Sequence, residues 1–279
     1  MAPLPSGWRP VLRRSLSSNK KQSDCERPSR LARDWISCES ADLHMIDFHC
    51  HILPNMDDGA ESVAASLAML RQSFLQGVDV MVSTSHFYGH EEYPQRFLER
   101  RAEAFDRLQE AMLLQPEVFP DITLGAEVLY FPGISQAEEL ASLTIGDSRC
   151  ILIEPPMAKW SDAMLDDIMY MGAYGLQPVI AHVDRYMNYL RDDSLITRVW
   201  ERNLLVQVNA DYFLNPATVR SAMRDLRQGC IYLLGSDCHN LDSRAPNLDR
   251  ARRAAIRWGL EREFDRLSQN AEQLLKRKG

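Results

Sequence analysis

From residue 45 onward, short apolar runs alternate with amphipathic stretches of helical length, and this alternation restricts the fold more than any other feature. The runs are rich in β-branched residues and predict strands over 45–49, 78–86, 122–128, 150–155, 177–183, 204–210 and 231–237. Helices are predicted over 61–76, 92–114, 162–174, 192–203, 216–228, 247–258 and 261–277. Strands that alternate with helices form parallel βα units with right-handed crossovers. Seven such units predict an α/β fold, a closed or nearly closed barrel, in one domain over 45–279.

Residues 1–44 lack this alternation. They are rich in Ser, Arg and Pro, and they hold eight Lys or Arg residues against five Asp or Glu residues. The apolar region of a secretory signal is missing, and the acidic residues from Asp24 onward do not suit a transit peptide. We expect a disordered tail, or a start codon assigned too early with Met45 as the true start.

The composition excludes several classes of protein. A net charge of −7 does not suit a general nucleic-acid binder, which presents a basic face. No apolar run approaches the roughly 20 residues of a membrane-spanning helix. The six cysteines show no disulfide or zinc-finger spacing, so reduced thiols in a cytoplasmic protein are expected.

Ligand-type side chains end nearly every predicted strand. In chain order the strands close with His49 and His51, His86, Glu127, Glu154, His182, Asn209 and Asp211, and finally Asp237 and His239. Five of the seven histidines of the chain lie at these positions. Because the carboxyl ends of barrel strands meet on one face, these side chains are expected to share one pocket.

Two strands carry a pair of such residues around a cysteine. Side chains alternate along a strand with period two, so His49 and His51 point to one side and Cys50 to the other. Asp237-Cys238-His239 repeats the pattern. About seven ionisable groups buried together without counter-charge would be costly, which favours bound cations over satisfied core residues.

Residues 237–244 also allow a different interpretation. Cys238 and Arg244 have the Cys-x5-Arg spacing of a thiol phosphatase loop. Such a loop wraps its backbone N–H groups around a phosphate, which favours glycine and disfavours acids. This stretch has no glycine, and Asp242 would repel the phosphate, so the metal interpretation is favoured.

Histidine and carboxylate ligands suit Zn, Mn or Fe, and a set this large indicates more than one ion. Clustered divalent ions turn a bound water into a hydroxide nucleophile and neutralise phosphoryl oxygens. Hydrolysis of a phosphoester is therefore expected, although amide or lactone hydrolysis would use similar groups.

The motifs "MIDFHCHILPNMDDGA", "TSHFY", "GAEV", "ILIEPP", "AHVDRY" and "GSDCHN" together resemble the polymerase-and-histidinol-phosphatase (PHP) superfamily. More narrowly, the chain resembles the CpsB/YwqE-type metal-dependent tyrosine phosphatases of capsule and exopolysaccharide clusters. The resemblance covers about residues 45–279. It implies a distorted (β/α)7 barrel with three metal ions at the C-terminal ends of the strands, manganese above iron or zinc.

The resemblance also implies a ligand set. The first ion takes His49, His51, Glu127 and Asp237; the second takes Glu127 as a bridge, Glu154 and His182; the third takes Asp58, His86 and His239. Asp58 is chosen over Asp57 because the matching family residue precedes a glycine. Asp57 remains an alternative ligand, or a cap for the helix expected near Glu61.

Arg185 and Arg244 follow two ligand-bearing strand ends, where the family also carries arginines. A guanidinium fork matches phosphate oxygens and stabilises transition-state charge, so both are expected to hold the phosphoryl group. Phe87, Tyr88 and Phe131 could line a phosphotyrosine ring or simply pack in the core. His90 is expected on a solvated loop.

The expected activity is hydrolysis of phosphotyrosine in a protein, the C-terminal tail of a bacterial tyrosine autokinase. The chain would work beside a membrane-bound kinase without entering the membrane. One alternative is a PHP phosphatase for a small metabolite, of the histidinol-phosphate type. The other is a catalytically silent regulatory protein, which the complete set of ligand-type residues disfavours.

Overall fold

The computed structural model describes residues 45–190 and 195–276. Nine parallel strands are defined there: β1 (Met45–Cys50), β2 (Val78–Ser83), β3 (His86–Phe87), β4 (Asp121–Leu124), β5 (Glu127–Leu129), β6 (Cys150–Glu154), β7 (Gln177–Ile180), β8 (Leu205–Asn209) and β9 (Leu233–Gly235). The expected tail over 1–44, the start of the predicted helix at 192–194 and the last residues, 277–279, lie outside the described residues.

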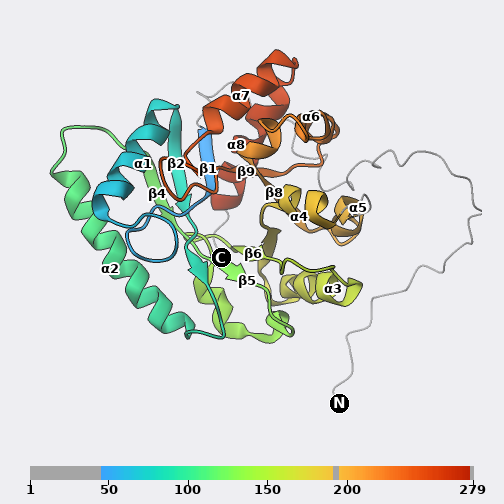
Figure 1. Cartoon of the computed structure of the whole chain (residues 1–279). Coiled ribbons are helices and arrows are strands. Elements are labelled where there is room, and N and C mark those ends of the chain that lie inside the picture. Colours follow the sequence, from blue (N-terminus) through green and yellow to red (C-terminus); the bar gives the residue numbers. More distant parts are fainter. Residues whose placement is uncertain (1–44, 191–194, 277–279) are drawn as a thin grey trace, which may run out of the picture.

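Helices surround the strands (Figure 1). The α-helices are α1 (Val63–Leu75), α2 (Pro94–Leu113), α3 (Asp162–Tyr170), α4 (Val183–Leu190), α5 (Leu195–Trp200), α6 (Val219–Gln228), α7 (Leu248–Arg257) and α8 (Glu261–Leu275). Short 3-10 segments are η2 (Ile134–Gln136), η3 (Glu138–Leu143), η4 (Met171–Tyr174) and η5 (Ala210–Phe213). The predicted stop of α6 is confirmed, because Gly229 ends it in the left-handed region at φ 74°.

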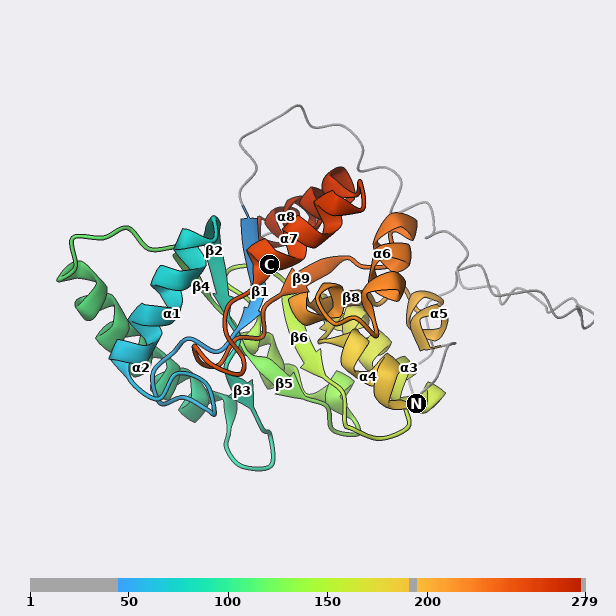
Figure 2. The same ribbon diagram turned by 45° about the horizontal axis from the view of Figure 1, so that its top comes forward.

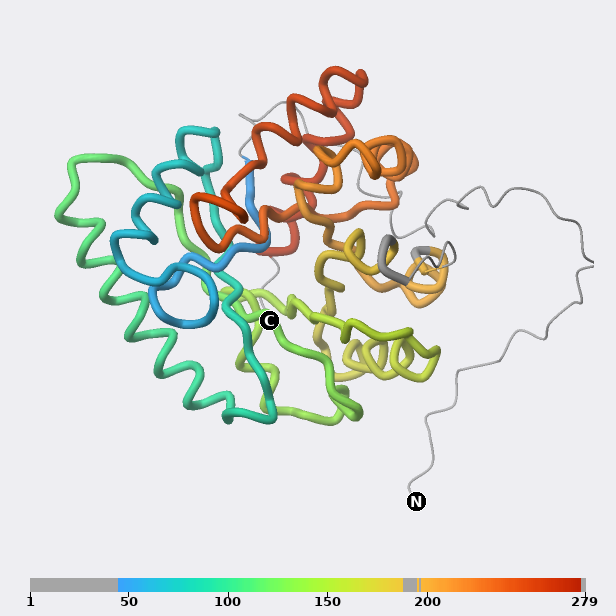
Figure 3. The backbone as a smooth tube through the Cα atoms, viewed as in Figure 1, coloured from blue at the N-terminus to red at the C-terminus, as the bar shows by residue number. Residues whose placement is uncertain are grey.

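The strands form a curled parallel layer that divides into two sheets, and within each sheet the neighbours follow the order of the chain. One sheet has the order β1-β2-β4, and the second has the order β3-β5-β6-β7-β8-β9. The chain travels once around this sheet, so that the red C-terminal helices return beside blue β1 (Figures 2 and 3). A hydrogen bond from the Ile46 N–H to the Ser268 hydroxyl, 3.2 Å, joins β1 to α8. The prediction of a distorted barrel is confirmed.

Two predicted strands are each broken in two. The run 78–86 divides into β2 and β3, and the run 122–128 divides into β4 and β5. The breaks coincide, because β2 pairs with β4 and β3 pairs with β5. At the break the Thr84 N–H donates to Cys50 O on β1 (2.9 Å), whereas Ser85 O accepts from the Glu127 N–H (3.0 Å). The pairing therefore passes from the β1-β2-β4 sheet to the β3-β5 pair at this break.

The predicted strand 177–183 is also too long. It ends at Ile180, and Val183 begins α4, a helix that the sequence patterns do not indicate. His182 makes the turn with φ 32°, in the left-handed region. Val183 and Tyr186 are fully buried, so the apolar residues after 180 pack as a helix face rather than as a strand.

The two ends of the sheet meet between β1 and the segment after β9. The Asp237 N–H donates to His49 O (2.7 Å), and the His51 N–H donates to Cys238 O (2.9 Å). Gly235 permits this approach, because a Cβ added there would lie 2.4 Å from His49 Cβ. The closure places the two ligand-bearing ends, His49-Cys50-His51 and Asp237-Cys238-His239, side by side.

Candidate metal centre

The structure brings together all nine residues that were predicted to bind metal, at the C-terminal ends of the strands. The imidazole nitrogens and carboxylate oxygens of these residues form three overlapping groups. One lies around His49 and His51, one around Glu154 and His182, and one around His86 and His239. Glu127 connects the first two groups.

The first group joins β1, β5 and the end of β9. His49 Nε2 lies 3.1 Å from His51 Nε2, 3.2 Å from Glu127 Oε2 and 3.6 Å from Asp237 Oδ1. His51 Nε2 lies 3.3 Å and 3.5 Å from the same two oxygens. The four side chains are almost completely buried. Two imidazole nitrogens and two carboxylate oxygens therefore point toward one position, whereas Cys50 and Cys238 point away from it.

The second group uses the other oxygen of Glu127. His182 Nε2 lies 2.8 Å from Glu127 Oε1 and 3.7 Å from Glu154 Oε1. Burial, followed by the charge of Glu127, raises the pKa of Glu154 to about 7. Oxygen atoms of Glu127 and Glu154 lie within 4.8 Å of each other, so the two carboxylates repel each other unless a cation lies between them.

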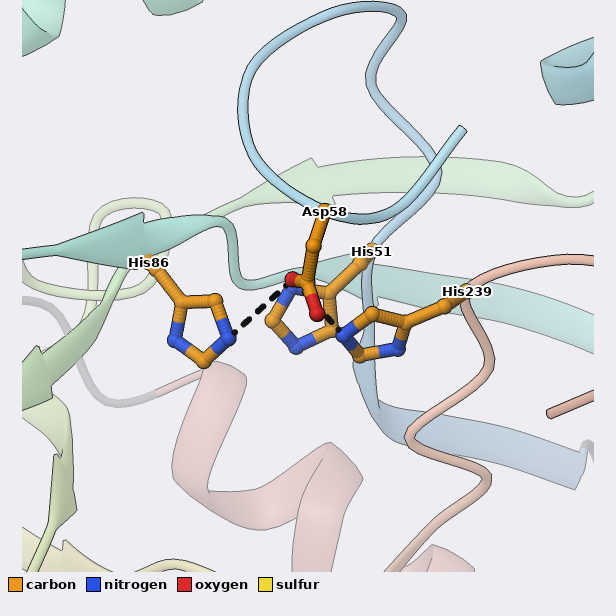
Figure 4. Close-up of side chains that lie close together, drawn as sticks. All are labelled: His51, Asp58, His86 and His239. Carbon is orange, nitrogen blue, oxygen red and sulfur yellow. Dashed lines mark ion pairs between the residues drawn. The ribbon is translucent and has the colours of Figure 1, made fainter. Parts of the chain in front are cut away.

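The third group comprises Asp58, His86 and His239, with His51 shared from the first group (Figure 4). Its Asp58 side chain is 64% exposed, so this group lies nearer the solvent than the first. Asp58 Oδ1 is 3.4 Å from His86 Nε2 and 3.2 Å from His239 Nε2, as the dashed lines show. His86 Nδ1 faces the second group, 3.1 Å from Glu127 Oε2 and 3.6 Å from Glu154 Oε2. His86 thus connects the third group to the other two.

Two observations indicate that these residues suit divalent cations. His86 Nδ1 and His239 Nε2 are buried without a hydrogen-bond partner, although most buried polar atoms in proteins have one. His239 Nδ1 is occupied, since it lies 2.9 Å from Asp237 O, so Nε2 is the nitrogen left to bind an ion. The donors are imidazole nitrogens and carboxylate oxygens, which suit Mn, Fe or Zn.

Asp57 and Asp58 play different parts. The Asp57 carboxylate accepts hydrogen bonds from His51 Nδ1 (2.9 Å), the His86 N–H (2.9 Å) and the Gly59 N–H (3.0 Å). Burial alone would raise its pKa, but the ion pair and hydrogen bond with His51 lower it well below its usual range. Asp57 therefore orients His51 from behind, while Asp58 faces the open histidine nitrogens.

Gly59 is needed beside this pair, because a Cβ there would lie 2.3 Å from His51 O. The alternative role of Asp57 as a helix cap is wrong. The helix α1 is capped by Ser62, whose hydroxyl accepts from the Ala65 N–H at 3.2 Å.

Two further residues support the site. Gln207 Oε1 accepts from the His182 N–H (2.6 Å) and lies 3.3 Å from His49 Nδ1. Asn209, predicted to lie at this strand end, donates from Nδ2 to Asp237 Oδ2 at 2.8 Å and so orients that carboxylate. Gln207 was missed, although a glutamine inside the buried run "LLVQVNA" is a signal that could have identified it.

Asp47 is a second buried group that sequence reasoning missed. Its Oδ1 accepts from the Ser236 N–H at 2.8 Å and from the His49 N–H at 3.3 Å. Burial raises the pKa of Asp47 to about 6, above the usual range of an aspartate. Asp47 thereby ties β1 to the segment that carries Asp237.

Both predicted arginines reach the site. Arg185 Nη2 donates to Asp237 Oδ2, and Arg244 Nη2 donates to Asp237 Oδ1 at 2.6 Å. Their side chains are 37% and 36% exposed, so each guanidinium keeps a face toward solvent at the rim of the site. Two fixed cations beside a cluster of carboxylates are suited to hold an anionic substrate.

The thiol interpretation of residues 237–244 does not fit the structure. Cys238 is completely buried. The N–H groups of His239 and Asn240 donate to Arg244 O, at 2.9 and 3.3 Å, rather than opening toward a phosphate. Of the two parts of Cys-x5-Arg, only the arginine lies at the site.

Of the predicted aromatic residues, Phe87 is buried in the core, whereas Tyr88 is half-buried and stacks on His86. Burial and the nearby charges of Glu154 and Glu127 raise the pKa of the Tyr88 phenol, so this hydroxyl stays neutral. Phe131 is half-buried, and His90 is exposed, as expected.

Comparison with known proteins places these features in a family. Residues 45–276 match the family model "Capsular polysaccharide synthesis, CpsB/CapC". The chain is 32% identical over 219 residues to the tyrosine-protein phosphatase CpsB of Streptococcus pneumoniae, covering 74% of this chain and 88% of CpsB. It is 29% identical over 250 residues to the tyrosine-protein phosphatase YwqE of Bacillus subtilis, covering 83% and 92%.

The fold agrees with this assignment. A chain from the crystal structures of YwqE and CpsB, described as unique metal-dependent tyrosine phosphatases, superimposes with a TM-score of 0.73. Its identity is 26%, and the match covers 84% of this chain and 96% of that chain. Among the described residues, no helix is long and apolar enough to span a membrane. The chain therefore belongs to the CpsB/CapC family of capsular polysaccharide synthesis proteins.

Proposed function

We propose that this chain is a metal-dependent protein-tyrosine phosphatase of capsule or exopolysaccharide synthesis. The observation that carries the proposal is the convergence of nine ligand-type side chains and two arginines at one end of the barrel. The relatives that share this fold are named tyrosine-protein phosphatases. Residues 45–279 form the catalytic domain in this proposal.

Three ions are held, one by each group of side chains. His49, His51, Glu127 and Asp237 bind the first; Glu127, Glu154 and His182 bind the second; Asp58, His86 and His239 bind the third. Manganese is the expected metal, with iron or zinc as alternatives, because these ligands select weakly among the three. When bound, the ions supply a hydroxide from water and neutralise phosphoryl oxygens.

The protein side chains hold the substrate. Arg185 and Arg244 each donate to one oxygen of Asp237, which holds both guanidinium groups beside the candidate metal centre. Each fork binds phosphoryl oxygens and stabilises the charge that grows on them as the ester bond breaks. A tyrosine phenolate is a fairly good leaving group, so the reaction depends less on a general acid than it would with an alkyl ester.

The proposed substrate is the phosphorylated C-terminal tail of a bacterial tyrosine autokinase, met in the cytoplasm beside the membrane. A flexible tail suits a site whose arginines are partly exposed, because the phosphorylated residue must reach in from solvent. No nucleic acid is involved, in keeping with the net charge of −7.

Metal analysis combined with a chelation and reconstitution assay tests the proposal. Removal of metal abolishes turnover of a phosphotyrosyl peptide and added Mn²⁺ restores it, whereas Cys238→Ser keeps most activity. The reverse pattern would show a thiol mechanism. A preference for histidinol phosphate over the peptide would favour a metabolite phosphatase, and less than one metal ion per chain would favour a silent regulator. A chain that begins at Met45 keeps the activity if the domain assignment is right.

A further inference from the structure

The segment after β3 places an aromatic residue beside the candidate metal centre. Side chains alternate along an extended chain, so His86 and Tyr88 share one face and Phe87 lies on the other. Phe87 is 1% exposed and packs edge-on against Phe97, with ring centroids 5.4 Å apart. It therefore belongs to the core, and of these two neighbouring aromatic residues Tyr88 is the one beside the site.

Tyr88 is held in place by its neighbours. Its ring stacks on the His86 imidazole, with centroids 5.3 Å apart and planes 18° apart. Its carbonyl accepts from the N–H groups of Glu91 (2.9 Å) and Glu92 (3.3 Å), which form a turn directly after it. The centroid of the exposed His90 ring lies 6.0 Å from that of Tyr88. A half-buried ring fixed in this way loses little entropy on binding a ligand.

Tyr88 also lies on the side from which a substrate enters. The side chains of His49, His51 and Glu127 are at most 1% exposed, whereas those of His86 and Glu154 are 13% and 16% exposed. Arg185 and Arg244, which hold the phosphoryl group in the proposed function, are also partly exposed, and Arg244 Nη1 lies 3.6 Å from Oδ2 of Asp58, the residue that contacts His86. In the bound substrate, the organic group esterified to the phosphate must therefore extend toward solvent past these partly exposed residues.

We infer that Tyr88 packs against the phenyl ring of the substrate and is a specificity-determining residue for aryl over alkyl phosphates. This inference rests on the proposed function, because it assigns the recognition of the leaving group at the same site. Aromatic pairs prefer edge-to-face or offset packing, which a ring fixed along the His86 edge can offer to a phenyl group that emerges from the phosphate. An alkyl ester gains nothing comparable.

Two phosphonates that are not hydrolysed separate ring recognition from chemistry. Inhibition constants for phenylphosphonate and methylphosphonate are measured on the metal-loaded full chain and on the Tyr88→Leu and Tyr88→Phe variants. Tyr88→Leu is expected to weaken phenylphosphonate about threefold to tenfold, with methylphosphonate and metal content unchanged. Tyr88→Phe keeps the ring and is expected to behave as wild type.

Tyr93 offers a matched control, because it is an exposed tyrosine in the same connection, immediately before α2. Tyr93→Leu is expected to change neither constant. The inference is overturned if Tyr88→Leu weakens both phosphonates equally or neither, or if Tyr88→Phe loses as much as Tyr88→Leu, which would indicate the hydroxyl. Wild-type turnover of a phosphotyrosyl peptide, measured in parallel, tests the proposed function separately.

Discussion

Replacement of Asp57 by asparagine tests whether the two neighbouring aspartates have the different roles that their contacts indicate. The carboxylate of Asp57 accepts from three donors: His51 Nδ1, the His86 N–H and the Gly59 N–H. An asparagine of the same shape has one oxygen and one NH2 group. At least one of the three donors must then face another donor, and the hydrogen bond to His51 loses its ionic character.

The expected loss follows from these contacts. A buried donor left without a partner costs about 1–3 kcal/mol, and a charge-assisted hydrogen bond is worth about 1 kcal/mol more than a neutral one. We expect Asp57→Asn to lower the free energy of unfolding of the metal-free protein by about 2–4 kcal/mol. Because His51 also loses its orienting partner, metal affinity is expected to fall about 10- to 100-fold.

Asp58→Asn is the matched variant. The Asp58 side chain is 64% exposed, so in the metal-free protein its loss is expected to change stability by no more than about 0.5 kcal/mol. It should still weaken the binding of one ion, since it removes a carboxylate that faces His86 and His239. Urea unfolding with chelator present measures stability, and competition with a chelator of known affinity measures metal binding. Equal destabilisation by the two variants, or a stable Asp57→Asn protein, would refute the assigned roles.

The same structure supports three further predictions. Because His51 lowers the pKa of Asp57, the stability that Asp57 contributes is present above the unfolded pKa near 4 and is lost at lower pH. Asp57 in turn raises the pKa of His51 against the opposing effect of burial, so the stability of this pair also declines as the pH rises above the unfolded histidine pKa near 6.5. In metal-free protein the difference in urea stability between wild type and Asp57→Asn should therefore be largest at about pH 5–6 and shrink below about pH 4 and above about pH 6.5. Gly235→Ala should lower the free energy of unfolding by about 3 kcal/mol, since its Cβ would lie 2.4 Å from His49 Cβ. Gly172→Ala is its control in the same urea titration, because no atom lies within 4 Å of the added Cβ. Arg244→Lys should raise the KM for a phosphotyrosyl peptide about tenfold, because an ammonium cannot replace the fork; an unchanged KM would remove Arg244 from the phosphate site.

The sequence alone indicated the barrel and the membership of the site. Apolar runs of strand length alternate with helical stretches, and nearly every run ends in an imidazole or a carboxylate, so the parallel topology itself predicts one pocket. The period of two placed His49 and His51 together and turned Cys50 away, and the distances agree. These features depend on local patterns and on a topology rule, which a single sequence can express.

Other features depend on partners that are distant in the chain. The run 78–86 breaks where its partner 122–128 also breaks, and Val183, whose side chain is buried against other elements, begins a helix. Neither outcome can be deduced from residues 78–86 or 177–183, since an apolar run looks the same whether it pairs as a strand or packs as a helix.

The different roles of Asp57 and Asp58 likewise depend on the tertiary structure. Both residues precede Gly59, and the sequence allows either to bind metal. Only the fold brings His51 Nδ1 and the His86 N–H behind one carboxylate and leaves the other facing the open nitrogens of His86 and His239. The sequence by itself thus determined that imidazole and carboxylate side chains gather at one end of the barrel. The hydrogen bonds between distant segments decided which of their atoms are free to bind an ion.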